Sequence, residues 1–262
     1  MKDGRVVAIT GAGGGIGRKI VDRFLANGDR VIGLDRAKFC LNELAASRNT
    51  NDQLSTFCVD ITDKDAVDRF AKQIQRAHGR VDILVNCAGF YPVVPFEEMT
   101  QSQWLEVIAI NLTGTFRRTH SLLPLMKGRG WGRIINIGST SVFEGVVGQT
   151  HYVSAKAGLG FTRSLAMEVG DYGITANLVA PGLTLTGPVQ KSMPEKLIKD
   201  KPNFGHLGVA KSLRILQGPC SCCVRRMPIV FQDRCWSWMA ARSSTNALQP
   251  EGDTSCKANK QR

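Results

Sequence analysis

Five of the seven residues from 11 to 17 are glycines, and their position between two apolar patterns limits the folds open to this chain. Before them, residues 5–10 form a short apolar run typical of a buried strand. After them, Ile16, Ile20 and Phe24 recur at helical spacing, and Gly28 favours a helix end. A strand, a glycine turn and a helix begin a βαβ unit, and such a turn lets backbone N–H groups approach a phosphate.

The same alternation continues along the chain. Short apolar runs predict further strands over residues 30–34, 54–59, 81–85, 133–137 and 174–179. Between them, helical spacing predicts helices over residues 16–26, 41–47, 62–77, 100–126 and 151–169, with capping boxes at Thr62-x-x-Asp65 and Thr100-x-x-Gln103. We therefore expect the α/β class: a doubly wound parallel sheet, Rossmann-like, with helices on both faces.

Composition excludes several other classes. The 262 residues are 43% hydrophobic and 21% charged, which is ordinary for a globular protein. No run approaches the roughly 18 apolar residues of a membrane span, and the N-terminus has no signal-peptide pattern. Cys40, Cys58 and Cys87 are scattered as in a reducing compartment. We expect a cytoplasmic protein with no membrane partner.

The last part of the chain differs from the rest. Residues 205–262 hold nine Lys and Arg against three Asp and Glu, and five of the eight cysteines. Basic charge beside Trp236 and Trp238 raises the alternative of nucleic-acid binding, but no recognised motif accompanies it. Zinc ligation by Cys220, Cys222, Cys223 and Cys235 lacks paired knuckles and a suitably spaced histidine pair. We expect no nucleic acid and no metal, and a domain over 1–204 followed by an aberrant tail over 205–262.

An acidic residue indicates which dinucleotide the glycine turn would hold. Asp35 ends the second predicted strand, 18 residues after Gly17. A carboxylate there can accept hydrogen bonds from the ribose hydroxyls and repels a 2′-phosphate, which favours NAD. Arg36 leaves NADP open, because a guanidinium can pair with that phosphate.

Further motifs follow in a fixed order. They are Asp60-Ile61 after the third strand, Asn86-Cys87-Ala88-Gly89 after the fourth, Asn111 in Ile-Asn-Leu-Thr-Gly, Ser139 after the fifth, Tyr152-x-x-x-Lys156, and Asn177-x-x-x-Pro181-Gly182. Over residues 4–186 the chain resembles the short-chain dehydrogenase/reductase family, with Cys87 in place of the family's second asparagine.

The resemblance implies roles for individual residues. It implies that Asn111, Ser139, Tyr152 and Lys156 are catalytic, and that Ser139 and Tyr152 contact the substrate. It implies that the cofactor, NAD, is held by Gly11, Gly15, Ile16, Gly17, Asp35, Asp60, Ile61, Asn86, Ala88, Gly89, Tyr152, Lys156, Pro181, Gly182 and Thr184. It also implies a homo-oligomer. For Asn111 a helix-distorting role in packing remains the alternative.

Tyr152 and Lys156 are four residues apart and so share one helix face. An ammonium near a phenol lowers the pKa of that phenol, so we expect Tyr152 to exchange a proton with an alcohol or carbonyl while hydride passes to or from nicotinamide. Residues 90–96 and 130–133 are similar to the family's NAD-dependent dehydrogenases of aromatic secondary alcohols. We expect a small, apolar secondary alcohol or ketone, with an NADP-dependent 3-oxoacyl reductase as the alternative. Candidate pocket residues are Pro92, Phe143, Val146, Leu183 and Met193.

The tail lacks segments that the resemblance implies, namely a Pro-Glu-Asp-Ile-Ala helix and a final Val-Asp-Gly-Gly strand. Reading from the third base of each codon gives Pro-Glu-Asp-Pro-Ala from Ser212 onward and Val-Asp-Gly-Gly before Ala241. In the second segment Trp238-Met239 can only shift to Asp, Met239-Ala240 to Gly, and Cys235-Trp236 to Leu. We therefore expect a frameshift at a point between residues 188 and 204. It predicts a last strand that is missing or disrupted and a doubtful oligomer. It also raises a second reading, a catalytically impaired or non-enzymatic family member.

Overall fold

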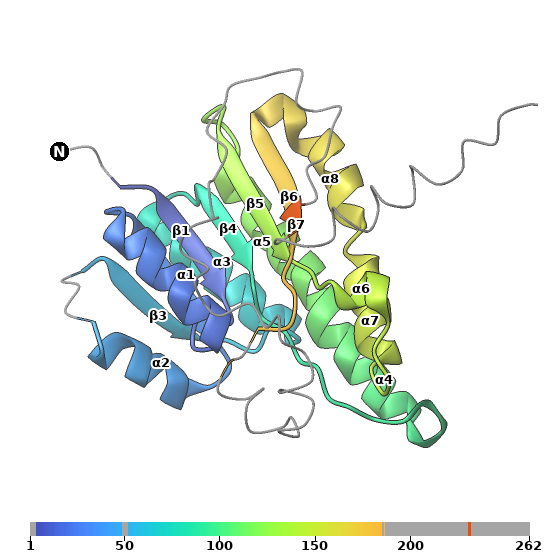
Figure 1. Ribbon diagram of the computed structural model, residues 1–262. Coiled ribbons are helices and arrows are strands. Elements are labelled where there is room, and N and C mark those ends of the chain that lie inside the picture. Colours follow the sequence, from blue (N-terminus) through green and yellow to red (C-terminus); the bar gives the residue numbers. More distant parts are fainter. Residues whose placement is uncertain (1–3, 49–51, 185, 187–229, 232–262) are drawn as a thin grey trace, which may run out of the picture. The chain divides into compact units, whose positions relative to one another are not determined.

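A computed structural model describes residues 4–48, 52–184, 186 and 230–231 (Figure 1). Six parallel strands form its sheet: β1 (Val6–Thr10), β2 (Arg30–Asp35), β3 (Leu54–Cys58), β4 (Ile83–Asn86), β5 (Gly132–Ile137) and β6 (Ile174–Ala180). Their spatial order is β3-β2-β1-β4-β5-β6, followed by the two-residue β7 (Val230–Phe231). The order reverses at β1, where β2 and β4 lie on opposite sides. In such sheets a ligand binds at the carboxyl ends of the strands beside this switch point.

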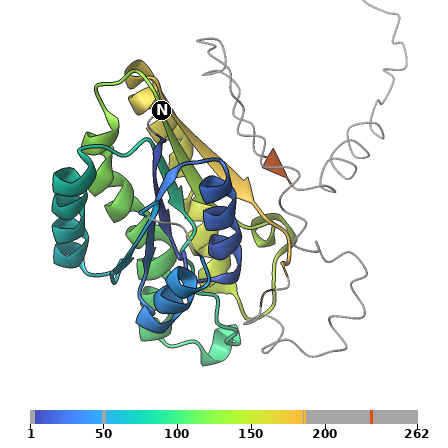
Figure 2. The ribbon, with the colours of Figure 1, turned by 90° about the vertical axis from the view of Figure 1, so that its left-hand side faces the viewer.

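Helices cover both faces of the sheet, as the sequence predicts (Figure 2). One face packs against α1 (Gly15–Ala26) and α2 (Lys38–Ala46). The other packs against α3 (Lys64–His78), α5 (Gly114–Met126) and α8 (Phe161–Val169). The remaining helical segments are η1 (Phe96–Glu98), α4 (Gln101–Ile108), η2 (Ala109–Thr113), α6 (Ser141–Glu144), α7 (Thr150–Gly158) and η3 (Gly170–Tyr172).

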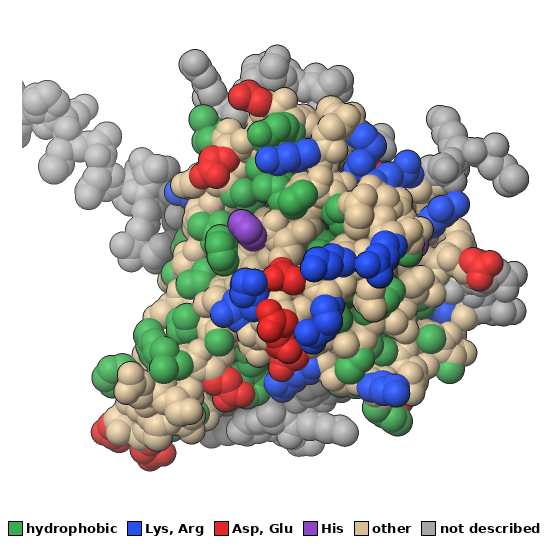
Figure 3. Space-filling model, turned by 180° about the vertical axis from the view of Figure 1, so that it is seen from behind, with side chains coloured by type: hydrophobic (Ala, Val, Ile, Leu, Met, Phe, Trp, Pro, Cys, Tyr) green, Lys and Arg blue, Asp and Glu red, His purple; other side chains and the backbone are tan. Residues whose placement is uncertain are grey.

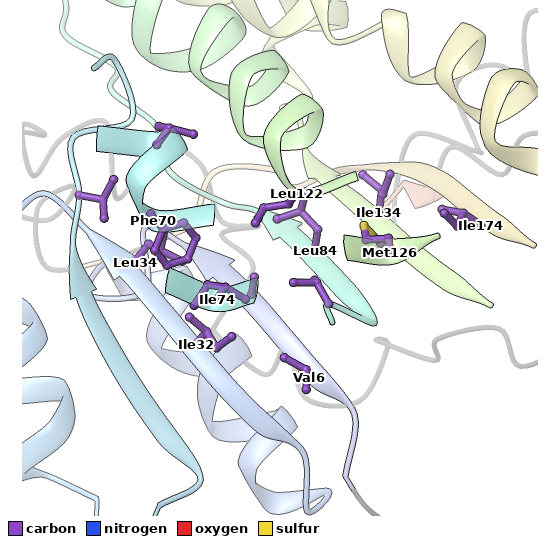
Figure 4. Packing of buried hydrophobic residues seen from close by; sticks show 14 of the residues in the cluster. Val6, Ile32, Leu34, Phe70, Ile74, Leu84, Leu122, Met126, Ile134 and Ile174 are labelled. Atoms are coloured by element: carbon purple, nitrogen blue, oxygen red, sulfur yellow. The ribbon is translucent and has the colours of Figure 1, made fainter. Parts of the chain in front are cut away.

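Successive residues of a strand point to opposite faces of the sheet and belong to two separate hydrophobic cores. In β1, Val6 and Ala8 belong to the core under α3 and α5, whereas Val7 and Ile9 belong to the core under α1 and α2. Figure 4 shows the first core, where the Phe70 ring lies among strand side chains. This two-sided burial explains why the strands read as continuous apolar runs rather than as alternating ones.

The structure corrects the predicted start of the helix over 62–77. Asp63 is the N-cap of α3, and its carboxylate accepts hydrogen bonds from the backbone N–H of Asp65 and Ala66. Thr62 lies one residue before this cap, and its hydroxyl donates to Asp60. The capping box of Thr100 and Gln103 on α4 is confirmed.

Two predicted long helices are interrupted. The helix over 100–126 contains a π-helical turn, η2, between α4 and α5. The helix over 151–169 is divided at Leu159–Gly160 into α7 and α8. Periodicity alone did not reveal either interruption, since apolar residues continue on both sides.

The chain divides into two units, residues 1–230 and 231–262. Five predictions fall outside the described residues: the boundary at residue 204, the frameshift window, the cysteine group from Cys220 to Cys235, Met193, and the missing or disrupted last strand after Phe231. In the part that is described, no helix is long and apolar enough to cross a membrane. Figure 3 shows acidic and basic side chains intermixed on one face rather than gathered by sign.

Candidate active site

The glycine turn between β1 and α1 is closely packed against the loop after β4. Gly11 has a φ of +65°, and a Cβ added to it would lie 2.8 Å from the Cα of Ala88. A Cβ on Gly17 would lie 2.0 Å from the carbonyl oxygen of Gly11. Side chains are therefore excluded at Gly11 and Gly17, and the N-terminus of α1, with Gly15 and Ile16 in its first turn, meets the carboxyl edge of the sheet. This backbone geometry fits a dinucleotide pyrophosphate.

Asp35 lies at the end of β2 with its carboxylate fixed in place. One oxygen accepts a hydrogen bond from Gly13 N at 3.1 Å, and the other accepts from Ala37 N at 3.0 Å. Each oxygen retains a lone pair for a ribose hydroxyl. The negative charge is thus held beside the glycine turn, as the sequence predicts for a cofactor ribose site.

The segment after β3 contributes a second acidic residue and an apolar side chain. Thr62 donates from its backbone N–H and from its hydroxyl to Asp60, and these bonds hold the pKa of Asp60 below its ordinary value. Ile61 is buried, with its Cδ1 beside Gly114 at the start of α5. These two residues can border an adenine ring at this end of the edge.

Asn86 is placed differently from the rest of the predicted cofactor set. Its buried amide donates to Thr119 and to Asn136, and it accepts from the guanidinium of Arg118. This network holds β4, β5 and α5 together. The buried Asn86 side chain therefore stabilises the carboxyl edge of the sheet from within the protein. Ala88 lies nearer the glycine turn, where its N–H donates to the hydroxyl of Thr10.

Ser139, Tyr152 and Lys156 meet at the carboxyl end of β5. The Ser139 hydroxyl accepts a hydrogen bond from the hydroxyl of Ser141 at 2.7 Å and is also hydrogen-bonded to Tyr152. Lys156 Nζ lies 5.7 Å from the centre of the Tyr152 ring and donates to the carbonyl of Ile137 at 2.8 Å. The spacing of four residues on α7 therefore brings both side chains to one place, as predicted.

The expected direction of the Tyr152 pKa is wrong in this structure. Burial raises the pKa of Tyr152 to about 12, against a smaller lowering by the Ser139 hydrogen bond. Burial also lowers the pKa of Lys156 to about 8. The Lys156 ammonium is bound to a carbonyl and does not offset the desolvation of the phenol. Tyr152 is consequently a proton donor in this state.

Asn111 lies in the π-helical turn and is completely buried. Its amide donates to the carbonyl of Phe90 at 2.7 Å and to that of Val107 at 3.0 Å, and its oxygen accepts from Phe90 N at 3.2 Å. A Cβ on Gly89 would lie 3.1 Å from the Asn111 amide oxygen and 3.8 Å from Lys156 Nζ. Asn111 and Lys156 therefore both lie next to Gly89 in the loop after β4.

The loop after β6 closes the other side of the site. Thr140 N donates to the carbonyl of Pro181. A Cβ added to Gly182 would lie 4.0 Å from the hydroxyl oxygen of Thr140. The Thr184 hydroxyl donates to the carbonyl of Gly182, a local bond that stabilises the turn. Thr186 also belongs to this region, although it was not among the residues predicted from the sequence. Its buried side chain packs on Gly15, and the alternation Thr184-Leu-Thr186 was the signal that could have found it.

A cavity of about 200 Å³ adjoins Ser139 and Lys156, with Val142, Phe143, Leu159 and Leu178 among its lining residues. Of the predicted pocket residues, Phe143 lines this cavity, whereas Pro92, Val146 and Leu183 do not. Apolar side chains are exposed on the loops near Tyr152, including Tyr91, Val93 and Val147. The Tyr91 ring meets the Tyr152 ring edge to face at 6.1 Å. These loops are joined by a hydrogen bond from Val94 N to the carbonyl of Gly148.

Comparison with known proteins agrees with this geometry. Residues 5–197 match the family model described as short chain dehydrogenase. The chain is 35% identical to the 3-oxoacyl-acyl-carrier-protein reductase of Haemophilus influenzae, over 80% of this chain and 87% of that protein. It is 40% identical to a hydroxy(phenyl)methylsuccinyl-CoA dehydrogenase subunit of Thauera aromatica, over 73% and 77%. The crystal structure of gox2181 superposes with a TM-score of 0.71 at 33% identity, covering 76% of this chain and 79% of that one. The chain belongs to the short-chain dehydrogenase/reductase family.

Proposed function

We propose that the protein transfers hydride between NAD(H) and a small, apolar secondary alcohol or ketone, with Tyr152 as general acid and base. The observation that carries the proposal is the meeting of Ser139, Tyr152, Lys156 and Asn111 beside a glycine turn with no room for a side chain at Gly11 and Gly17. The family consists of oxidoreductases, which supports the reaction class.

The described residues suit the reduction of a carbonyl in the following way. Reduced nicotinamide supplies the hydride when it is bound. Tyr152, whose raised pKa of about 12 keeps it protonated, gives its phenolic proton to the substrate oxygen. Ser139 donates a hydrogen bond to the same oxygen and orients it. In the reverse direction Tyr152 takes the alcohol proton back.

Lys156 contributes to proton transfer through the hydrogen-bond donors of its ammonium group. Its Nζ has three donors, of which one is bound to the Ile137 carbonyl. The other two can hold the nicotinamide ribose and a water on the way to Asn111. Because burial lowers the lysine pKa to about 8, the ammonium can give up a proton near neutral pH.

Asp35 supports NAD as the preferred cofactor. Its fixed carboxylate would bind the ribose hydroxyls and repel a 2′-phosphate. Arg36 supports the alternative, since it is exposed and adjacent. The relative from Haemophilus influenzae, named as a 3-oxoacyl reductase, supports the alternative of a 3-oxoacyl substrate. Exposed apolar side chains at Tyr91, Val93 and Phe143 support the apolar alcohol. The substrate named for the Thauera relative carries both a phenyl group, which supports an aromatic alcohol, and a CoA thioester, which supports the alternative.

We also propose that the tail over residues 205–262 is out of frame and that it impairs the enzyme. The match to the family model ends at residue 197, inside the window of 188–204 in which we expect the shift, and this supports the proposal. Sequencing the gene is the direct test. Codons that do not spell the shifted Val-Asp-Gly-Gly would refute it.

One experiment tests the reaction itself. Binding is followed by the change in NADH fluorescence, and turnover is screened against aryl and alkyl secondary alcohols and against 3-oxoacyl thioesters. We expect binding of NADH and turnover of an apolar alcohol, with higher turnover after the frame is restored. Binding without turnover in both proteins would support the non-enzymatic reading, and the absence of binding would refute the cofactor site.

A further inference from the structure

One contact links the segments after β2 and β4 across the end of β1. The guanidinium carbon of Arg36 lies 5.8 Å from the centre of the Phe90 ring. Because β1 lies between β2 and β4 in the sheet, this contact spans the switch point where the glycine turn begins (Figure 1). A guanidinium over an aromatic face at this distance is a cation–π pair.

Phe90 and Arg36 differ in how far their positions are fixed by other contacts. Both backbone polar groups of Phe90 are bound by the buried amide of Asn111, at 3.2 and 2.7 Å, and its side chain is half-buried. Arg36 is exposed at the surface. Phe90 is therefore the fixed member of the pair, and Arg36 is the member that can move.

Arg36 is also the cation placed next to the ribose site of Asp35. The Asp35 carboxylate is held by Gly13 N and Ala37 N, so its charge stays where a 2′-phosphate would arrive. A 2′-phosphate needs a cation to offset that charge. Arg36 follows Asp35 directly, but its guanidinium is directed across the sheet edge toward Phe90.

We propose that Phe90 is a specificity residue for the cofactor: its ring competes with a 2′-phosphate for Arg36 and so favours NAD over NADP. The inference rests on the proposed dinucleotide site. It adds to the charge of Asp35 a second determinant, which lies in the loop after β4 and carries no charge. To pair with the phosphate, Arg36 must leave the ring and lose that contact.

The test measures the dissociation constants of NADH and NADPH by fluorescence titration, without substrate. For Phe90→Leu we expect the ratio Kd(NADPH)/Kd(NADH) to fall about two- to fivefold, the usual size of an exposed cation–π pair. Phe90→Tyr keeps the ring and should keep the wild-type ratio. Phe96→Leu removes an exposed phenylalanine from η1 and is the matched control, with no change expected.

A second background separates this mechanism from a general loosening of the loop. In Arg36→Leu protein, the further change Phe90→Leu should leave the ratio unaltered. An unchanged ratio in Phe90→Leu alone, or an equal effect with and without Arg36, would overturn the inference while leaving the cofactor site intact. Wild-type protein that binds neither nucleotide would refute the proposed function, and the inference with it.

Discussion

Replacing Asn111 by alanine is expected to reduce both stability and turnover. The side chain is completely buried and makes three hydrogen bonds, to Phe90 N, Phe90 O and Val107 O. At about 1 kcal/mol for each bond, the free energy of unfolding should fall by about 3 kcal/mol. For a chain of this size that corresponds to a decrease in Tm of about 6–12 °C.

The assay is urea denaturation followed by tryptophan fluorescence, in which the midpoint should fall with the slope m unchanged. Asn177→Ala is the matched control, because the Asn177 amide is bonded to the Thr175 hydroxyl near the surface, at 3.3 Å. It should cost less than about 0.5 kcal/mol. A loss below about 1 kcal/mol in Asn111→Ala would show that the three bonds are not formed. A normal kcat in a destabilised variant would leave Asn111 with a packing role alone.

Three further predictions concern proton transfer, cofactor choice and pH. Tyr152→Phe should lower kcat by about 10²–10⁴-fold while NADH titration gives an unchanged Kd; a variant retaining more than a few per cent of kcat contradicts the role of Tyr152. Asp35→Ser should raise the NADP/NAD ratio of kcat/KM at least about tenfold, because charges about 5 Å apart interact by about 3 kcal/mol; equal wild-type constants for both nucleotides would refute this. Burial lowers the pKa of His151 below its ordinary 6.5, so the unfolded chain binds the proton more readily and stability should fall as pH decreases below about 6.5. His151→Asn, whose amide oxygen can accept the same bond from Tyr152 N, should flatten this decline in urea midpoints between pH 7 and 5, and an equally steep decline would contradict it.

The strands and the residues at their carboxyl ends could be predicted from the sequence because burial on both faces leaves unbroken apolar runs. Val6–Thr10 and Arg30–Asp35 agree with the predicted ranges within one residue. Parallel strands then bring Asp35, Ser139 and the turn after β1 to one edge, whatever the details of the helices.

What the sequence did not reveal depends on contacts between distant segments. The Tyr152 pKa follows from how much of the phenol is desolvated by neighbouring loops, which a spacing of four residues does not report. The place of Asn86 in a network with Thr119, Asn136 and Arg118 likewise requires knowledge of which side chains α5 and β5 present to it. Neither the Tyr152 pKa nor the Asn86 network can be inferred from the local spacing of residues along the chain.

The π-helical turn has a consequence for how such a site can change. It accommodates one more residue than an α-helical turn, so deleting Leu112, which follows Asn111 in this turn, would give a more regular helix. The same deletion would rotate everything before it by about 100° relative to α5. The Asn111 amide could then no longer meet the Phe90 backbone while α5 keeps its place on the sheet. The helical irregularity and the polar contact are therefore one feature, gained or lost together by a change of a single residue in length.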